Sequence, residues 1–161
     1  GYFRTGDIGV IEKGLLKITD RKKEMFKTSG GKYIAPQIIE NKFKQSRFIE
    51  QIMVVGEGEK MPCVIIQPNF QTLKDYLNIK NIAVPLTNEE LIENSAIVDL
   101  IQREIEKMNQ GLGHWEQIKK FELTPEEWTI DEGLLTPTLK LKRKNVLAKY
   151  QDLYKKLYNK A

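Results

Sequence analysis

The 161-residue sequence has one cysteine, one histidine and no long hydrophobic run. Because Cys63 is the single cysteine, an internal disulfide framework and a tetrahedral Cys/His zinc site are excluded, and we predict no metal site. With His114 as the single histidine, a Ser-His-Asp arrangement would have to converge on that residue. Apolar runs such as 64–66 have the length of a strand, whereas a membrane span needs about 20 apolar residues.

The net charge is small but unevenly distributed. Lys and Arg number 26 against 22 Asp and Glu, which gives +4. Residues 138–161 carry eight basic side chains and Asp152 as the one acid, so this segment has a net charge of +7 and the rest has −3. Such a segment can bind nucleic acid, an anionic membrane or a phosphorylated ligand. A solvated helix face is the favoured interpretation.

Length and pattern predict one α+β domain with a small appendage. Apolar stretches around Glu12-Lys13-Gly14 predict a β-hairpin over 10–18, and strands are expected at 51–55, 63–67 and 115–123. Helices are predicted from Pro36 to about residue 48, over 70–77 and over 146–157. One long helix is predicted from about 91 to 112, and a short helical turn at 124–127. The three tyrosines of the last helix and Cys63 are expected to pack in the fold.

Three segments carry more Gly, Thr and Lys than folding requires. The first is GYFRTGD at 1–7, where a carboxylate on a turn could accept two hydrogen bonds from the hydroxyls of a ribose. The second is 20–32, a cationic stretch that ends in a Gly-Gly loop suited to phosphate oxygens. The third is 134–140, a turn ending in a lysine that could act as a mobile point charge.

Together these segments resemble the adenylate-forming enzymes, in the form typical of long-chain fatty acid CoA ligases. GYFRTGD resembles the ribose-binding motif of that family, DRKKE at 20–24 its interdomain hinge, and KTSGGKYIAPQIIE at 27–40 its glycine motif. The segment 136–144 is similar to the catalytic-lysine motif. Many relatives have Gly before that lysine, whereas Leu139 precedes Lys140 here, and Lys142 is a less favoured match.

The resemblance implies a role for each matching residue. Asp7 would bind the ribose hydroxyls of ATP, Arg21 would contact the same nucleotide, and Lys140 would be the catalytic residue at the α-phosphate. The domain would pivot on Lys23, after which Gly30 would let the pantetheine arm pass close to the backbone. Lys27 would contact a phosphate of the nucleotide or of CoA.

The resemblance also implies the organisation and the partners. Residues 1–22 would be the end of a large N-terminal domain, and 23–161 a mobile C-terminal lid. The full enzyme would use ATP, Mg²⁺ and CoA to activate a fatty acid, with none of them tightly bound to this piece. Because 1–7 looks like neither a signal peptide nor a natural start, we expect a fragment that is inactive without its N-terminal domain.

Two alternatives remain open at this point. An acyl-adenylate ligase could pass the acyl group to a carrier protein instead of CoA. A basic module for nucleic acid or membrane would explain the +7 segment but would leave the motifs of Asp7, Gly30 and Lys140 unexplained, so we expect no nucleic acid partner. A cytoplasmic location is expected, and a weak peripheral contact with the inner face of a membrane is compatible with a fatty acid substrate.

Overall fold

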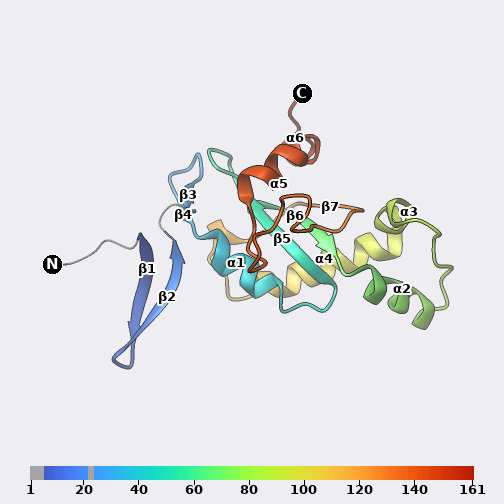
Figure 1. Ribbon diagram of the computed structural model, residues 1–161, viewed down its shortest axis with the longest axis horizontal. Coiled ribbons are helices and arrows are strands. Elements are labelled where there is room, and N and C mark those ends of the chain that lie inside the picture. Colours follow the sequence, from blue (N-terminus) through green and yellow to red (C-terminus); the bar gives the residue numbers. More distant parts are fainter. Residues whose placement is uncertain (1–5, 22–23) are drawn as a thin grey trace.

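The computed structural model describes residues 6–21 and 24–161, in which short strands and helices alternate (Figure 1). Strands β1 (Asp7–Glu12) and β2 (Leu15–Arg21) form an antiparallel ribbon, and β3 (Phe26–Lys27) pairs with β4 (Tyr33–Ile34). Strands β5 (Ile49–Val55), β6 (Cys63–Pro68) and β7 (Phe121–Leu123) form a sheet in that order, with β7 parallel to β6. The predicted α+β class is confirmed.

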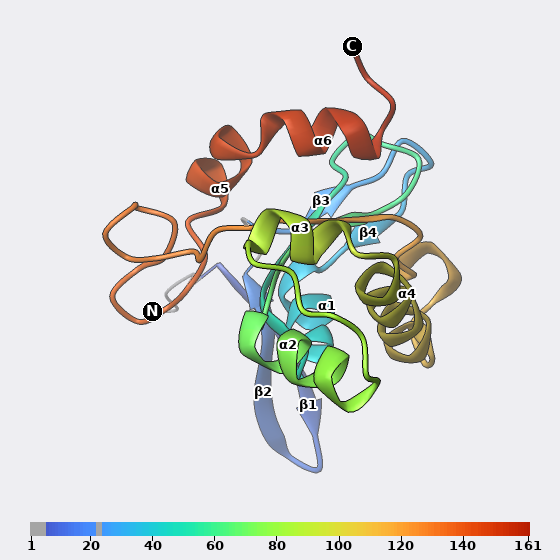
Figure 2. The same cartoon turned by 90° about the vertical axis from the view of Figure 1, so that its right-hand side faces the viewer.

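The sheet separates two apolar clusters because side chains alternate between its faces. One face carries Ile52 and Val54 of β5, under the helices α1 (Pro36–Phe43), α2 (Phe70–Ile79), α3 (Asn88–Glu93) and α4 (Ser95–Asn109). The other face carries Met53 and Val55, under α5 (Arg143–Lys149) and α6 (Gln151–Leu157). Figure 2 shows α5 and α6 on one side of the sheet and α1, α2 and α4 on the other.

The predicted hairpin and the predicted central strand pair are confirmed. Lys13 and Gly14 at the ribbon's turn both have positive φ, 52° and 79°, as a tight two-residue hairpin turn requires. β5 and β6 pair antiparallel around the polar turn at 56–60. Helix α1 is shorter than predicted, because the chain turns at 44–48 so that β5 can begin at Ile49.

The predicted long helix from 91 to 112 is two helices, because Asn94 ends α3 and begins α4. Its backbone leaves the helical region at ψ 126°, and its side-chain oxygen accepts the N–H of Ala96 (3.0 Å). The last helix is also divided, at Tyr150, into α5 and α6. Local apolar spacing does not detect such breaks, since both pieces keep the same buried side.

Two predictions between α4 and α5 are wrong. Of the predicted strand at 115–123, only β7 is extended as a strand, and His114–Glu116 is a turn of 3₁₀-helix. The predicted helical turn at 124–127 does not form, because Thr124 N–H donates to the carbonyl of Ile66 (2.8 Å) and Trp128 N–H to the side chain of Gln67 (2.8 Å). Those bonds hold this stretch against β6. Among the described residues, no helix is long and apolar enough to cross a membrane.

Candidate functional site

Lys140 lies at the end of a closed turn that precedes α5 in the sequence. The arms of the turn are joined by a bridge between Leu135 and Leu141, and Thr136 N–H donates to the carbonyl of Lys140 (2.8 Å). Leu139 N–H in turn donates to the carbonyl of Thr136 (2.8 Å). Pro137 is the second residue of that four-residue turn, a position that its fixed φ favours. The sequence therefore folds locally into a loop that presents an exposed lysine.

The residue before the lysine adopts a left-handed backbone. Leu139 has φ 61° and an exposed side chain, and left-handed geometry costs a non-glycine residue roughly 1–2 kcal/mol. The Thr136 hydroxyl accepts the N–H of Lys140 (3.0 Å), which helps to hold the strained residue in place. A turn followed by one left-handed residue is the usual short hairpin loop, and it explains why glycine suits this position.

Behind the turn, a cavity of about 240 Å³ separates Lys140 from α1. Its lining is mixed, and its polar side chains include Gln37, Asn41 and Lys44 of α1 and Gln51 of β5. Glu40 also lines it and is buried, and burial raises the pKa of its carboxyl while the Arg143 guanidinium and the N–H of Val54 oppose that rise.

The predicted glycine loop joins β3 to β4 and is fixed at both ends. Thr28 N–H donates to the carbonyl of Lys32 (2.9 Å), and Lys32 N–H donates to the Thr28 hydroxyl (3.2 Å). Ser29 N–H donates to the carbonyl of Glu59 (2.9 Å), which ties the loop to the β5–β6 turn. Lys27 is exposed, with its ammonium 5.6 Å from the ring centroid of Tyr33.

The two glycines of this loop differ in what they do for the fold. Gly31 has φ 84°, which side-chain-bearing residues rarely adopt. Gly30 has no positive φ, and a Cβ added there would meet only the Thr28 hydroxyl, at 3.9 Å. The described structure therefore explains glycine at 31 but gives no internal reason for glycine at 30.

The candidate nucleotide residues fall on the ribbon. Asp7 and Arg21 are paired opposite each other in the β1–β2 register, so two positions 14 apart in the sequence come together. Their side chains lie outside the described part of the structure, as does the hinge candidate Lys23. The roles of these three residues remain predictions.

The structure does not bring Lys140 and Gly30 together. Figure 2 shows the loops between β7 and α5 on one side of the domain and the β3–β4 loop on the other. Of the described cavities, the one that Lys140 lines does not include Gly30. The candidate site therefore consists of two separate surfaces.

Comparison with known proteins identifies the family. Residues 23–161 match the family described as the AMP-binding enzyme C-terminal domain. The chain belongs to this family. The resemblance inferred from the motifs is thereby confirmed.

Individual relatives agree with this assignment. The chain is 39% identical over 162 residues to long-chain-fatty-acid–CoA ligase 5 of Mus musculus, covering 98% of this chain and 23% of that protein. It spans about a quarter of the length of the curated relatives that it matches.

Solved structures share the fold. The adenylation domain of a carboxylate reductase from Mycobacterium chelonae superposes with a TM-score of 0.79 at 24% identity, over 99% of this chain and 23% of that one. The A-PCP didomain of a carboxylic acid reductase from Segniliparus rugosus, solved with AMP, superposes with a TM-score of 0.71 at 25% identity, over 96% and 20%.

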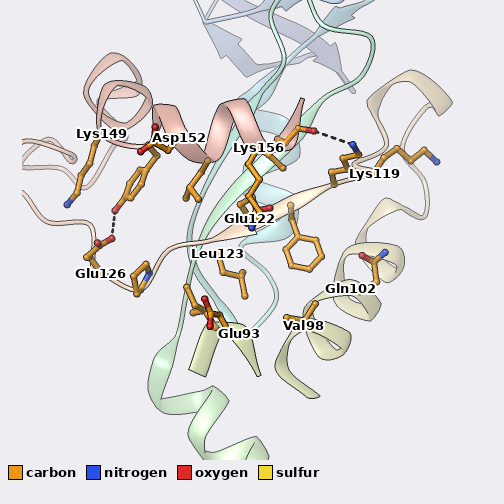
Figure 3. Close-up of a pocket in the computed structure, with 17 residues that line it drawn as sticks. Glu93, Val98, Gln102, Lys119, Glu122, Leu123, Glu126, Lys149, Asp152 and Lys156 are labelled. Carbon is orange, nitrogen blue, oxygen red and sulfur yellow. Dashed lines mark hydrogen bonds and ion pairs between the residues drawn. The ribbon is translucent and has the colours of Figure 1, made fainter. Parts of the chain in front are cut away.

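A further groove of this AMP-binding C-terminal domain holds none of the predicted site residues. It has a volume of about 820 Å³ and lies between α4, β7 and α6 (Figure 3). Some of its polar groups pair within the protein: Lys156 with Glu122 (3.0 Å) and the Tyr150 hydroxyl with Glu126 (3.0 Å).

Cys63 and two of the tyrosines of the last helix prove structural, whereas the side chain of His114 lies at the surface. Cys63 is buried in β6, and burial raises the pKa of its thiol. The Tyr158 hydroxyl donates to the carbonyl of Met61 (2.9 Å), and Tyr154 donates to Glu59 (2.8 Å). His114 is exposed.

Sequence reasoning missed the ion pair between Arg143 and Glu40, which joins α5 to α1. A signal was present in the helix pattern of this AMP-binding C-terminal domain: Glu40 shares the buried side of α1 with Pro36, Ile39 and Phe43. A carboxylate at a core position predicts a buried partner, although it does not identify which cation.

Proposed function

We propose that this chain is the C-terminal lid of a long-chain fatty acid CoA ligase. In the first half-reaction a fatty acid carboxylate attacks the α-phosphorus of ATP, and pyrophosphate leaves. In the second, the CoA thiol attacks the acyl carbon, and AMP leaves. The observation that carries the proposal is Lys140, held exposed on a closed turn in a chain whose relatives include long-chain-fatty-acid–CoA ligases.

Lys140 is the catalytic residue of the first step. Negative charge is concentrated between the carboxylate, the α-phosphate and the leaving pyrophosphate, and a positioned ammonium lowers the energy of that transition state. Asp7 would bind the ribose of ATP and Arg21 would contact the nucleotide. The pairing of these two positions across the ribbon supports a shared ligand.

Residues 1–22 form the end of the N-terminal domain, and 23–161 form the lid, which pivots on Lys23. The ribbon supports this division because it exposes five large apolar side chains, which need a partner to cover them: Val10, Ile11, Leu15, Leu16 and Ile18. An isolated two-stranded ribbon is also marginally stable in water.

The lid serves the two half-reactions with different surfaces. The loop between β7 and α5, to which Lys140 belongs, and the β3–β4 loop, to which Gly30 belongs, lie on different sides of the domain (Figure 2), so one active site can use both only if the lid reorients. In the second orientation Gly30 would face the pantetheine arm, and its missing side chain would leave room for it. Lys27, exposed beside that loop, would contact a phosphate of CoA or of the nucleotide.

The substrates of the full enzyme would be a fatty acid, ATP and CoA, with Mg²⁺ accompanying the nucleotide. In the part of the chain that the structure describes, no group of three or more His, Cys, Asp or Glu is placed to hold a metal ion. The described residues therefore offer no cluster of ligands that fits Mg²⁺, and we assign the ion to none of them. The N-terminal domain is the partner in cis, and we place the enzyme in the cytoplasm, with weak membrane contact as a further proposal.

Transfer to a carrier protein is the second candidate. The similarity to the A-PCP didomain of the Segniliparus enzyme supports it. Acyl transfer to the phosphopantetheine arm of a carrier, without formation of an acyl-CoA, would favour this candidate over the first.

Lys140→Ala in the full-length enzyme tests the proposal. We expect pyrophosphate exchange to fall by roughly 10²–10³-fold, because a preorganised charge at the reacting phosphate is lost. Thioester formation from preformed acyl-adenylate should remain near the wild-type rate.

Lys142→Ala is the matched control, since Lys142 is also exposed and lies two residues away. It should leave both half-reactions intact. The assignment of Lys140 as the catalytic lysine would be overturned if Lys140→Ala exchanged pyrophosphate at the wild-type rate. It would also be overturned if Lys142→Ala lost exchange instead.

A further inference from the structure

The side chain of Arg143 joins the Lys140 turn to the opposite face of the sheet. Arg143 is the first residue of α5, three positions after Lys140. Its Nη1 donates to Glu40 Oε2 (2.9 Å) and its Nη2 donates to Glu40 Oε1, so the guanidinium and the carboxylate pair through two parallel hydrogen bonds. Paired bonds of this kind fix orientation as well as distance.

The carboxylate that receives Arg143 is itself fixed. Glu40 is 4% exposed, and its Oε2 also accepts the N–H of Val54 in β5 (3.1 Å). Arg143 is thereby anchored to a helix and to a central strand pair through one buried group. The position of the guanidinium is therefore tied to that of α1 and β5.

A second carboxylate contacts the same guanidinium from the hinge side. Glu24 Oε2 lies 3.6 Å from Arg143 Nε, and the amide of Gln37 in α1 donates to the same Glu24 oxygen. Glu24 directly follows the hinge candidate Lys23 in the sequence. One arginine therefore touches both α1 and the segment on which the lid would pivot.

The turn's own hydrogen bonds determine its shape, whereas its contacts with the rest of the domain determine its place. The bonds that close the turn run within residues 134–142. Buried Leu134 and Leu135 fix the first arm in the cluster under α5 and α6, and partly buried Leu141 packs against the same cluster from the second arm. The second arm, which carries Lys140, leads directly to Arg143 and its pair on α1.

We propose that Arg143 is a positioning residue for Lys140. Arg143 sets the position of the lysine through its pair with Glu40 and links the lysine to the hinge segment through Glu24. The proposal rests on the proposed function, since it assumes that Lys140 acts in adenylation. Lysine cannot replace Arg143, because an ammonium lacks the planar fork that pairs with one carboxylate and still reaches a second.

Arg143→Lys in the full-length enzyme, assayed in both half-reactions, tests the proposal. We expect kcat for pyrophosphate exchange to fall about tenfold or more, since small misplacement of a reacting group is costly. The KM for ATP should stay within about threefold, and transfer from preformed acyl-adenylate should be unaffected. Arg103→Lys, an exposed arginine of α4, is the matched control and should leave both steps unchanged.

Combination with Lys140→Ala separates positioning from a general structural role. If Arg143 acts through Lys140, the double variant exchanges pyrophosphate no more slowly than Lys140→Ala alone. The proposal is overturned if the double variant exchanges pyrophosphate more slowly than Lys140→Ala by the same factor that Arg143→Lys loses on its own. It is also overturned if Arg143→Lys exchanges pyrophosphate at the wild-type rate. A wild-type exchange rate in Lys140→Ala would instead overturn the proposed function.

Glu24→Gln keeps the test decisive if Arg143→Lys does not fold. It weakens the hinge-side contact and leaves the buried Glu40 pair intact. We expect a smaller fall in exchange, about threefold, which also disappears in the Lys140→Ala background. Unchanged exchange in Glu24→Gln would refute the link to the hinge segment.

Discussion

Two adjacent glycines show how a single residue can serve either the fold or the function. Gly31 occupies a left-handed backbone position, whereas Gly30 occupies ordinary backbone, where an added Cβ would make one ordinary contact, with the Thr28 hydroxyl. The fold therefore accounts for one glycine, and the proposed passage of a pantetheine arm accounts for the other.

Alanine substitutions of the two glycines should have opposite consequences. Gly30→Ala should leave the free energy of unfolding within about 0.5 kcal/mol of the wild type, yet slow thioester formation in the full-length enzyme. Gly31→Ala should lower the free energy of unfolding by about 1 kcal/mol, because alanine is strained at positive φ. Urea unfolding and the thioester assay measure the two effects. Normal thioester formation in Gly30→Ala would count against its role.

At the scale of the elements, short polar side chains determine where helices begin. The side chain of Thr87 accepts the N–H of Glu90 (3.2 Å) at the start of α3. Asn94 does the same for α4, but it lies inside a continuous apolar pattern and therefore escapes prediction. A cap inside a periodic segment is recognisable only when the backbone is seen to leave the helix.

Asn94→Ala should destabilise the 161-residue chain by about 1 kcal/mol, because the N-cap of α4 is lost. Asn78→Ala provides the contrast, since Asn78 is exposed within α2, where alanine is the better helix former. That control should be neutral or slightly stabilising. Urea unfolding with both variants checks the sign, and equal effects would show that Asn94 is not acting as a cap.

At the scale of the whole molecule, the basic C-terminal segment finds acidic partners elsewhere in the chain. Lys149 pairs with Glu132 (3.3 Å), Lys156 with Glu122 (3.0 Å), and Lys160 with Glu59. Partly exposed pairs of this kind contribute little stability individually. They do show that part of the +7 charge faces carboxylates of the same chain, as the favoured interpretation of a surface helix implies.

Tyrosine hydroxyls of the same segment donate hydrogen bonds to Glu126 and to the end of β5 and the turn that follows it, and their ionisation should make the stability of the domain sensitive to alkali. The pKa of Tyr154 is raised to about 12, mainly by burial and secondly by the neighbouring Glu59 carboxylate. Burial also raises the pKa of Tyr150 and of Tyr158. The unfolded chain loses these protons near pH 10, before the folded chain does. The free energy of unfolding should therefore fall as the pH rises from about 10 to 12.

Urea unfolding at a series of pH values measures this fall. Tyr154→Phe has no hydroxyl to ionise and should show a shallower decline above pH 10, although it also loses the hydrogen bond to Glu59. An unchanged decline would show that Tyr154 contributes nothing to the alkaline sensitivity.

The sequence alone determined the fold class, the hairpin, the central strand pair and the positions of the candidate lysine and glycine loops. These features depend on neighbours a few residues apart, whose spacing and turn chemistry are visible in the sequence. The candidate site residues were found through motif resemblance, which identifies a residue without giving its surroundings.

The tertiary structure alone decided which distant groups meet. Arg143 and Glu40 are 103 positions apart and pair only because α5 and α1 pack near the same edge of β5. The N–H of Thr124 donates to the carbonyl of Ile66 in β6, and no helical turn forms there although the local sequence favours one. In both cases a polar group needs a hydrogen-bond partner when it is buried, and that partner lies far away in the sequence, where local patterns cannot predict it.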